Sequence, residues 1–189
     1  MADELRGRKV AILATDGVER VELEQPRGAL YGAGATTEVL SIHPGEIQAR
    51  QGDLDPAGTF PVDQLVSDAS ADDYDALLLP GGTMNPDQLR TNKDAIGFVQ
   101  AFMNAGKPVA TICHGPWTLA EADVVRGRRL TSWPSIRTDL RNAGAEVVDE
   151  EVVIDRQLTS SRSPADLPAF CAAIIEQFAR TGSPVSAGA

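Results

Sequence analysis

Groups that bind metals or form disulfides are scarce in this sequence, which has two cysteines and two histidines in 189 residues. Two histidines cannot supply an ordinary zinc site, and neither a Cys-x-x-Cys nor a His-x-x-x-His spacing occurs. Two cysteines are also too few for a small secreted disulfide scaffold, so Cys113 and Cys171 are predicted to be free thiols. The sequence therefore predicts no metal, and each thiol is either core packing or a reactive group.

Positive charge is scarce as well. Seventeen Lys and Arg residues stand against twenty-seven Asp and Glu residues, which gives a net charge of −10, and no basic run occurs. Such a charge repels phosphate backbones and anionic lipid, so nucleic acid and membrane partners are not expected. No stretch reaches the ~18 apolar residues of a membrane span, and the charged N-terminus lacks the apolar segment of a signal peptide. We therefore expect a cytoplasmic protein.

What the sequence does have is the composition of a globular protein, with 42% apolar and 23% charged residues. At roughly 150 residues per domain, the length predicts a single domain. We expect this domain to extend over residues 1–189, with a folded core at about 8–180 and a flexible Gly, Ser, Pro and Ala tail at 181–189.

Short apolar runs typical of buried strands alternate with segments of helical periodicity. Strands are predicted at 9–15, 36–42, 75–79, 108–112, 129–133, 146–154 and 157–160, and helices at 22–33, 86–105 (one helix or a broken pair), 116–125, 135–143 and 165–180. Residues 43–70 predict short extended pieces joined by turns. This alternation predicts an α/β fold with a mainly parallel sheet, helices on both faces and the first strand in a central position.

Three turns that contain glycine directly follow predicted strands. They are Asp16-Gly17, Pro80-Gly81-Gly82 and Cys113-His114-Gly115. Ligands of parallel α/β folds bind at the carboxyl ends of the strands, so these turns predict a functional site. Gly32 and Gly34 end a helix rather than follow a strand, so they do not indicate a dinucleotide site, and no cofactor is predicted.

Cys113 ends a buried strand and precedes Gly115 and a predicted helix, which is the arrangement of a nucleophile elbow. The hydrolase pattern Gly-x-Ser-x-Gly is half met, because Thr111 takes the first glycine position. The positive end of the helix favours a thiolate and predicts a thiol pKa lowered from about 8.5 into the range of roughly 3.5–7.5. The alternative is a small buried cysteine that only fills the strand end. Cys171 lies in an apolar helical pattern and is predicted to be core packing.

Several groups near the elbow could assist the thiol. The backbone N–H groups of Gly82 and His114 could stabilise an oxyanion. Glu19 could donate a hydrogen bond to a thiolate if its carboxyl is protonated, and the two groups would then titrate as a pair. The alternative for Glu19 is a solvated loop residue. The neighbouring Glu22 and Glu24 are predicted to be surface charges.

His114 could act as a general base if a carboxylate orients its ring. Asp87, just past the Gly-Gly turn, is the candidate for this carboxylate, from the same chain or from a neighbouring subunit. Otherwise Asp87 caps or begins its helix. His43 precedes a proline in a turn and is predicted to lie at the surface.

Four segments together resemble the DJ-1/PfpI superfamily, and most closely its PfpI-like intracellular protease branch. They are DGVERVEL at 16–23, LPGG at 79–82, ATICHGP at 110–116 and TSWPSIR at 131–137, within a resemblance that covers roughly residues 8–180. The resemblance implies a flavodoxin-like three-layer α/β sandwich, also described as class I glutamine amidotransferase-like. It also implies homodimers and, in some members, hexamers.

Motif positions carry the family's site onto this chain. The resemblance implies that Cys113 is the reactive cysteine, Glu19 its protonated partner, His114 the histidine beside it, Gly82 and His114 the oxyanion-hole amides, and Asp87 the acid that reaches a neighbour's histidine. Asp87 is one methylene shorter than the glutamate of PfpI-type peptidases. Gly81 and Trp133 are expected in the pocket, where some members have a tyrosine in place of Trp133. No histidine follows His114, so a glutaminase triad is impossible.

The resemblance implies a stress-response protein whose cysteine attacks electrophilic carbonyls. The substrate is either a small aldehyde, as in glyoxalase or deglycase chemistry, or a peptide, as in an intracellular cysteine peptidase. The alternative is a non-catalytic redox sensor or chaperone-like protein oxidised at Cys113 to a sulfinate. A binding or scaffold protein with an ordinary thiol is the third interpretation.

Overall fold

The structure is a computed structural model that describes residues 3–180, and it is built around a seven-stranded sheet. The strands of this sheet are β1 (Lys9–Leu13), β3 (Thr36–Ser41), β6 (Gln64–Leu65), β7 (Ala76–Leu79), β8 (Val109–Ile112), β11 (Val152–Asp155) and β12 (Leu158–Ser161). Their order is β11-β12-β8-β7-β1-β3-β6, and every neighbouring pair is parallel except β11 with β12. The predicted mainly parallel sheet, with its first strand inside, is confirmed.

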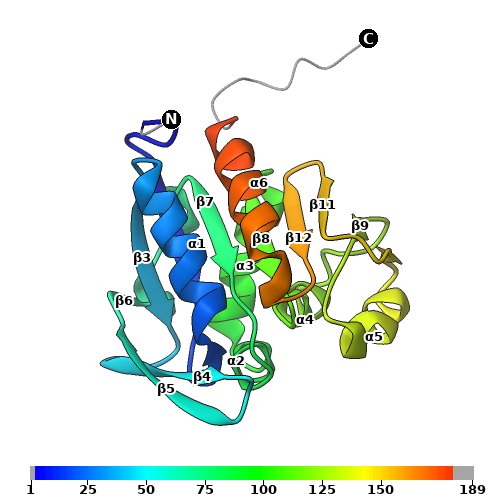
Figure 1. Cartoon of the computed structure of the whole chain (residues 1–189), viewed down its shortest axis with the longest axis horizontal. Coiled ribbons are helices and arrows are strands. Elements are labelled where there is room, and N and C mark those ends of the chain that lie inside the picture. The colour runs from blue at the N-terminus through cyan, green and yellow to red at the C-terminus, as the bar shows by residue number, and fades with distance from the viewer. Residues whose placement is uncertain (1–2, 181–189) are drawn as a thin grey trace.

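Helices cover both faces of this sheet (Figure 1). They are α1 (Arg20–Gly32) and α6 (Leu167–Ala179) on one face, and α2 (Met84–Leu89), α3 (Lys93–Asn104), α4 (Pro116–Glu121) and α5 (Arg137–Asn142) on the other. Alternate residues of β1 divide between the two cores: Val10 and Ile12 pack with α1 and α6, whereas Ala11 and Leu13 pack with α3 and α4. The molecule is therefore the expected three-layer sandwich.

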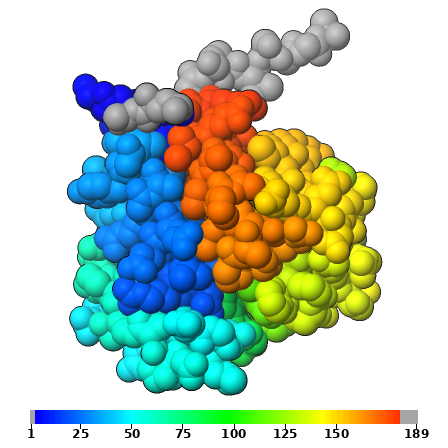
Figure 2. Space-filling view, viewed as in Figure 1, coloured from blue at the N-terminus to red at the C-terminus, as the bar shows by residue number. Residues whose placement is uncertain are grey.

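Smaller elements complete the fold. β2 (Val18–Glu19), β4 (Glu46–Gln51) and β5 (Asp55–Pro61) form a three-stranded sheet, β9 (Arg129–Leu130) pairs with β10 (Glu146–Val147), and 3-10 turns lie at η1 (Val66–Asp68), η2 (Ala71–Asp73), η3 (Pro134–Ile136) and η4 (Pro164–Asp166). α1 and α6 lie side by side on the surface, and the β4–β5 hairpin crosses one end of α1 (Figure 2).

Most predicted elements have the expected type, and the differences have local causes. The segment 86–105 is a broken pair, because the Asn92 side chain caps α3 by accepting from the Ala95 N–H at 3.0 Å. The helix expected over 116–125 ends at Glu121, since Asp123 takes a left-handed φ of 54°. The predicted tail at 181–189 lies outside the described residues. No helix within residues 3–180 is long and apolar enough to span a membrane.

The order of the strands brings the three glycine-containing turns together. From β1 the chain moves outward through β3 to β6, then returns to β7 on the other side of β1 and continues to β8 and β12. The reversal lies between β1 and β7, and a crevice at the carboxyl ends of the strands is expected at such a reversal. The turns after β1, β7 and β8 all open at this end.

Candidate active site

Cys113 directly follows β8 in a strained backbone conformation. Its φ of 61° lies in the left-handed region, which costs a non-glycine residue roughly 1–2 kcal/mol. Two neighbouring segments hold this geometry: the Cys113 N–H donates to the Ser161 carbonyl at 3.1 Å, and the Cys113 carbonyl accepts from the Trp133 N–H at 2.9 Å. Gly115 is needed behind the elbow, because a Cβ there would lie 2.6 Å from the Leu79 carbonyl oxygen. The structure therefore contains the predicted elbow.

Hydrogen-bond donors surround the sulfur of Cys113. The backbone N–H groups of Gly82 and His114 both bond to it, and each lowers the pKa of the thiol. These are the two amides predicted for an oxyanion hole, and the structure places both N–H groups at the sulfur. Their action on a substrate oxygen stays a prediction.

Glu22, not Glu19, is the carboxyl in contact with the thiol. Glu22 is fully buried, hydrogen-bonds with Cys113, and accepts the Gly81 N–H at 3.0 Å through Oε2. Glu19 instead accepts the backbone N–H groups of Gly52 and Asp53 at 2.9 and 3.4 Å. The assignment of Glu19 as the cysteine's partner and of Glu22 as a surface charge was wrong.

A helical pattern in the sequence could have identified Glu22. α1 begins at Arg20, and Glu22 shares a buried face with Pro26 and Leu30 at intervals of four residues. A carboxyl on the buried face of a helix, in its first turn, points at the strand ends rather than into solvent.

Burial keeps Glu22 protonated at neutral pH. It raises the pKa of Glu22 to about 8, against hydrogen bonds from Cys113 and Gly81 that lower it. Burial raises the pKa of the Cys113 thiol above its ordinary value, as does the negative charge of an ionised Glu22, and this outweighs the hydrogen bonds from Gly82 and His114. The predicted lowering of this pKa was therefore wrong. While Glu22 holds its proton, however, that charge is absent and the carboxyl can donate to the sulfur.

The ring of His114 connects the thiol with Ser135. Its Nδ1 lies 3.3 Å from the Cys113 sulfur and its Nε2 lies 3.2 Å from the Ser135 hydroxyl oxygen. Burial lowers the pKa of His114, so the imidazole is neutral at pH 7 and able to accept a proton. The arrangement can deprotonate a thiol during attack on a carbonyl.

A pocket of about 510 Å³ opens over the sulfur. It is lined by Cys113, His114, Trp133 and Gly82, by the acidic residues Glu19, Glu22 and Asp53, and by Val21, Gln51, Gly52 and Pro164. Trp133 and Gly82 thus lie where predicted. Gly81 does not line the pocket but lies behind it, against Glu22 and Cys113, which corrects the prediction for this residue.

The tip of the β4–β5 hairpin forms one wall of this pocket. Glu19 binds the Gly52 and Asp53 N–H groups of this tip. The Asp53 carboxylate in turn accepts the backbone N–H and the hydroxyl of Thr83, both at 2.7 Å. The hairpin is therefore fastened to the segments that follow β1 and β7.

Asp87 is exposed in the first turn of α2, which matches the alternative prediction that it begins its helix. It lines a separate pocket of about 640 Å³ with residues of α3 and α4, while His114 lines the pocket over Cys113. The same-chain pairing of Asp87 with His114 was therefore wrong. A contact with the histidine of a neighbouring copy stays a prediction.

Asn85 is a positioning residue that the sequence did not indicate. Its fully buried side chain accepts the Thr15 N–H at 2.8 Å and donates to the carbonyls of Pro80 and Gly81 at 3.0 and 3.1 Å. It thereby joins the turns after β1 and β7, and only the folded structure reveals that role.

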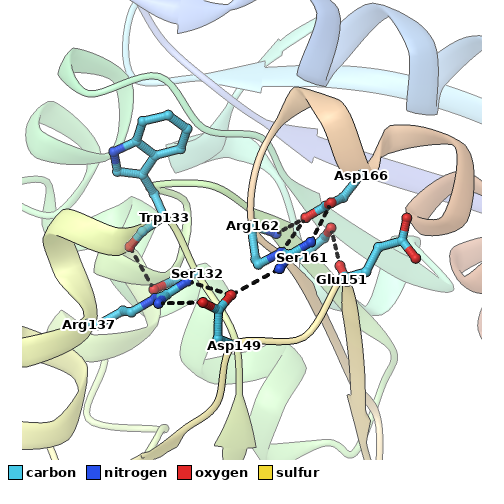
Figure 3. A network of polar contacts seen from close by, with 8 residues as sticks. All are labelled: Ser132, Trp133, Arg137, Asp149, Glu151, Ser161, Arg162 and Asp166. Carbon is cyan, nitrogen blue, oxygen red and sulfur yellow. Dashed lines mark hydrogen bonds and ion pairs between the residues drawn. The ribbon is translucent and has the colours of Figure 1, made fainter.

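An ion-pair network joins Arg137, Asp149, Arg162 and Asp166 (Figure 3). Asp149 accepts hydrogen bonds from Arg137 at 2.8 Å and Arg162 at 3.0 Å, and Arg162 also binds Asp166 at 2.8 Å. These two arginines follow Trp133 and Ser161, the residues whose backbones hold Cys113. The network joins the two segments at the surface.

Cys171 differs from Cys113 in its surroundings. It is half-buried on α6 rather than a full core residue, and burial raises its pKa to about 11. Within residues 3–180, no group of three or more His, Cys, Asp or Glu side chains is placed to hold a metal ion.

The chain belongs to the DJ-1/PfpI family, whose pattern it matches over residues 8–177. General stress protein 18 of Bacillus subtilis is 42% identical over 166 residues, which cover 87% of this chain and 94% of that protein. Protein/nucleic acid deglycase 2 of Escherichia coli is 41% identical over 165 residues, covering 86% and 93% of the two chains. The protein is thus a member of this family of the stress-protein type, its relatives include an enzyme, and Cys113 is present at the predicted position.

A solved structure shows the same fold. It is a two-domain protein from Anabaena variabilis with DJ-1/ThiJ/PfpI-like and ferritin-like domains, 37% identical, with a TM-score of 0.85. The match covers 96% of this chain and 52% of that one, so the present chain spans about half of the two-domain protein.

The proton on Glu22 predicts a distinctive pH dependence of thiol alkylation. Wild type and Glu22→Gln are expected to react alike at Cys113 below about pH 7, because both carry a neutral donor beside the sulfur. Above about pH 8 wild type should react more slowly than the variant, since the ionised Glu22 raises the pKa of the thiol. Iodoacetamide labelling followed by mass spectrometry measures both cysteines in one sample.

Cys171 serves as the internal control for this experiment. The pH midpoint of its alkylation should lie near its pKa of about 11 in both proteins. A faster reaction of Glu22→Gln already at pH 6 would show that Glu22 is ionised there and would contradict the assignment of the proton.

Proposed function

We propose that this protein is a glyoxalase- or deglycase-type enzyme in which Cys113 attacks the aldehyde carbon of an α-oxoaldehyde, free or carried as an adduct on an amine. One observation carries the proposal. The sulfur faces a pocket of about 510 Å³, with the Gly82 and His114 N–H groups bonded to it and a neutral imidazole nitrogen 3.3 Å away. The deglycase name of the Escherichia coli relative supports it.

The residues at the sulfur match the steps of this reaction. With a free aldehyde, the thiol proton moves to His114 Nδ1 as the S–C bond forms, and the carbonyl oxygen takes up the electron pair and then a proton. With an amine adduct, the S–C bond replaces the C–N bond at the same carbon, and the amine leaves with the proton that the thiol gave to His114. The N–H groups of Gly82 and His114 stabilise the charge on that oxygen. The aldehyde hydrogen then shifts to the neighbouring carbonyl carbon and the hydroxyl proton passes to the oxygen of that carbon, which gives a thioester. Water hydrolyses the thioester to an α-hydroxy acid and the free thiol. The net reaction consumes only water and requires no redox partner.

Peptide cleavage makes a further demand, because the leaving amine needs an acid oriented for proton donation. The described partner of His114 Nε2 is the Ser135 hydroxyl, and Asp87 lines the separate pocket. The reaction of a free aldehyde has no leaving amine and needs no such carboxylate, so the observed site fits it better than peptide hydrolysis.

The charge of the pocket bears on the substrate. Glu19 and Asp53 line it beside the protonated Glu22, and none of its lining residues is Lys or Arg. Asp53 and Glu19 also raise the pKa of Glu22 through their negative charge. We therefore propose neutral or cationic carriers, such as a guanidinium side chain, ahead of carriers that bear phosphate groups.

The deciding experiment supplies wild-type protein with free methylglyoxal, its adduct on Nα-acetylarginine, its adduct on guanosine triphosphate, and casein. Nuclear magnetic resonance then follows formation of lactate and recovery of the unmodified carrier. Lactate formation supports the proposal, and faster recovery of acetylarginine than of the nucleotide supports the charge preference. Casein cleavage without lactate would establish a peptidase. A stable Cys113 sulfinate after peroxide treatment, without any turnover, would establish the sensor instead.

A further inference from the structure

Ser135 lies next to His114 and Cys113, and the proposed reaction assigns it no role. Its hydroxyl oxygen lies 3.2 Å from Nε2 of His114, and Nδ1 of the same ring lies 3.3 Å from the Cys113 sulfur. The three side chains form a continuous path of hydrogen bonds. The path begins at a buried sulfur and ends at an exposed serine on η3.

Packing of the His114 ring does not depend on Ser135. The ring is 5% exposed and stacks on Trp133 at a centroid distance of 5.8 Å, with Trp117 on another side at 5.5 Å. Two aromatic neighbours therefore fix the plane of the imidazole. What the hydroxyl adds is a hydrogen-bond partner for Nε2.

A hydroxyl at Nε2 has a different effect from a carboxylate. A carboxylate only accepts, so it would hold the proton on Nε2 and fix one tautomer. A hydroxyl both donates and accepts, so it can bond either neutral tautomer of the ring. Nε2–H can donate to Ser135, or the Ser135 O–H can donate to Nε2 while Nδ1–H points at the sulfur.

We propose that Ser135 is a positioning residue that allows both neutral tautomers of His114 and carries protons between this buried ring and solvent. The inference rests on the proposed function for its role in turnover. As the thiol attacks, its proton enters the ring at Nδ1. The Nε2 proton passes to the Ser135 oxygen, which releases its own proton to water, and the ring is left neutral. The reverse movement returns a proton to the substrate oxygen.

Charged groups around the ring do not replace this path. The Asp53 charge on the hairpin acts on His114, and Glu22 on α1 bonds to Cys113 rather than to the ring. Asp139 on α5 accepts the Trp117 indole N–H at 2.9 Å. Of the described groups, Ser135 is the one that hydrogen-bonds Nε2.

The first test reads the ring directly by nitrogen-15 spectroscopy. The chain has two histidines, so a His43→Gln background leaves one imidazole, that of His114. In this background we expect shifts that report a mixture of neutral tautomers, and a single tautomer after Ser135→Ala. Ser135→Thr, which keeps the hydroxyl, should restore the mixture. Identical shifts with and without the hydroxyl would overturn the proposal.

The second test is kinetic. Ser135→Ala should lower kcat with the α-oxoaldehyde about tenfold, leave KM unchanged, and change the pH profile, while Ser135→Thr recovers the wild-type profile. The unfolding midpoint should not change, because Ser135 is exposed. A loss of kcat/KM that comes from KM alone, or no loss of activity, would contradict a proton relay through Ser135. If wild type turns over no aldehyde, the proposed function fails, and the nitrogen-15 result still decides the role of Ser135.

Discussion

Cys113→Ser is expected to lower kcat/KM for α-oxoaldehydes by about 10³-fold or more. Serine is nearly the same size and keeps the hydrogen bonds from Gly82 and His114, but its hydroxyl is a far weaker acid and nucleophile than a thiol. The loss should therefore appear in catalysis without a comparable loss in folding. Steady-state lactate formation, measured beside a urea unfolding curve for each protein, separates the two effects.

Cys171→Ser is the matched control, because Cys171 is half-buried on α6 and does not line the pocket. Its activity should stay within about twofold of wild type. Wild-type turnover by Cys113→Ser would show that the sulfur is not the nucleophile and would remove the basis of the proposed function.

Gly81→Ala is expected to disrupt both stability and reactivity. A Cβ at Gly81 would lie 2.4 Å from Glu22 Oε2 and 2.7 Å from the Cβ of Cys113, which are distances that side chains do not tolerate. The methyl group must therefore displace the carboxyl, the thiol or both. We expect the free energy of unfolding to fall by roughly 1–3 kcal/mol and Cys113 alkylation at pH 7 to change at least tenfold.

Gly97→Ala provides the opposite case for comparison. Gly97 lies inside α3, and nothing lies within 4 Å of the position of its Cβ. Alanine is the better helix former, so this variant should gain about 0.5–1 kcal/mol in free energy of unfolding. Urea denaturation of the two variants tests the pair. A Gly81→Ala protein as stable and reactive as wild type would mean that the site tolerates a shift of Glu22.

The core of the fold could be predicted because its elements have local signals. β1, β7 and β8 are short apolar runs that end in turns, and the order of elements fixes a parallel sheet. The β4–β5 hairpin could not be predicted in detail. Its register shifts between Gln48 and Arg50, and its place over the site depends on Glu19 and Thr83, which are distant in sequence.

The site was predictable where backbone geometry defines it and unpredictable where side chains meet across the fold. Cys113, Gly82 and His114 follow strand ends, so their positions follow from the sheet. The choice between Glu19 and Glu22 depended on whether the chain was still extended or already helical at each residue. Asn85 and Ser135 act through partners that only the tertiary structure brings near.

The hairpin tip supplies one wall of the pocket from outside the central sheet. The reacting sulfur and its amides come from turns of the central sheet, whereas Gln51, Gly52 and Asp53 come from an excursion outside that sheet. Insertions or substitutions between β4 and β5 can therefore remodel the wall that a ligand meets and leave the elbow intact. Sequence changes confined to the β4–β5 hairpin can thus alter ligand specificity without altering the reaction at Cys113.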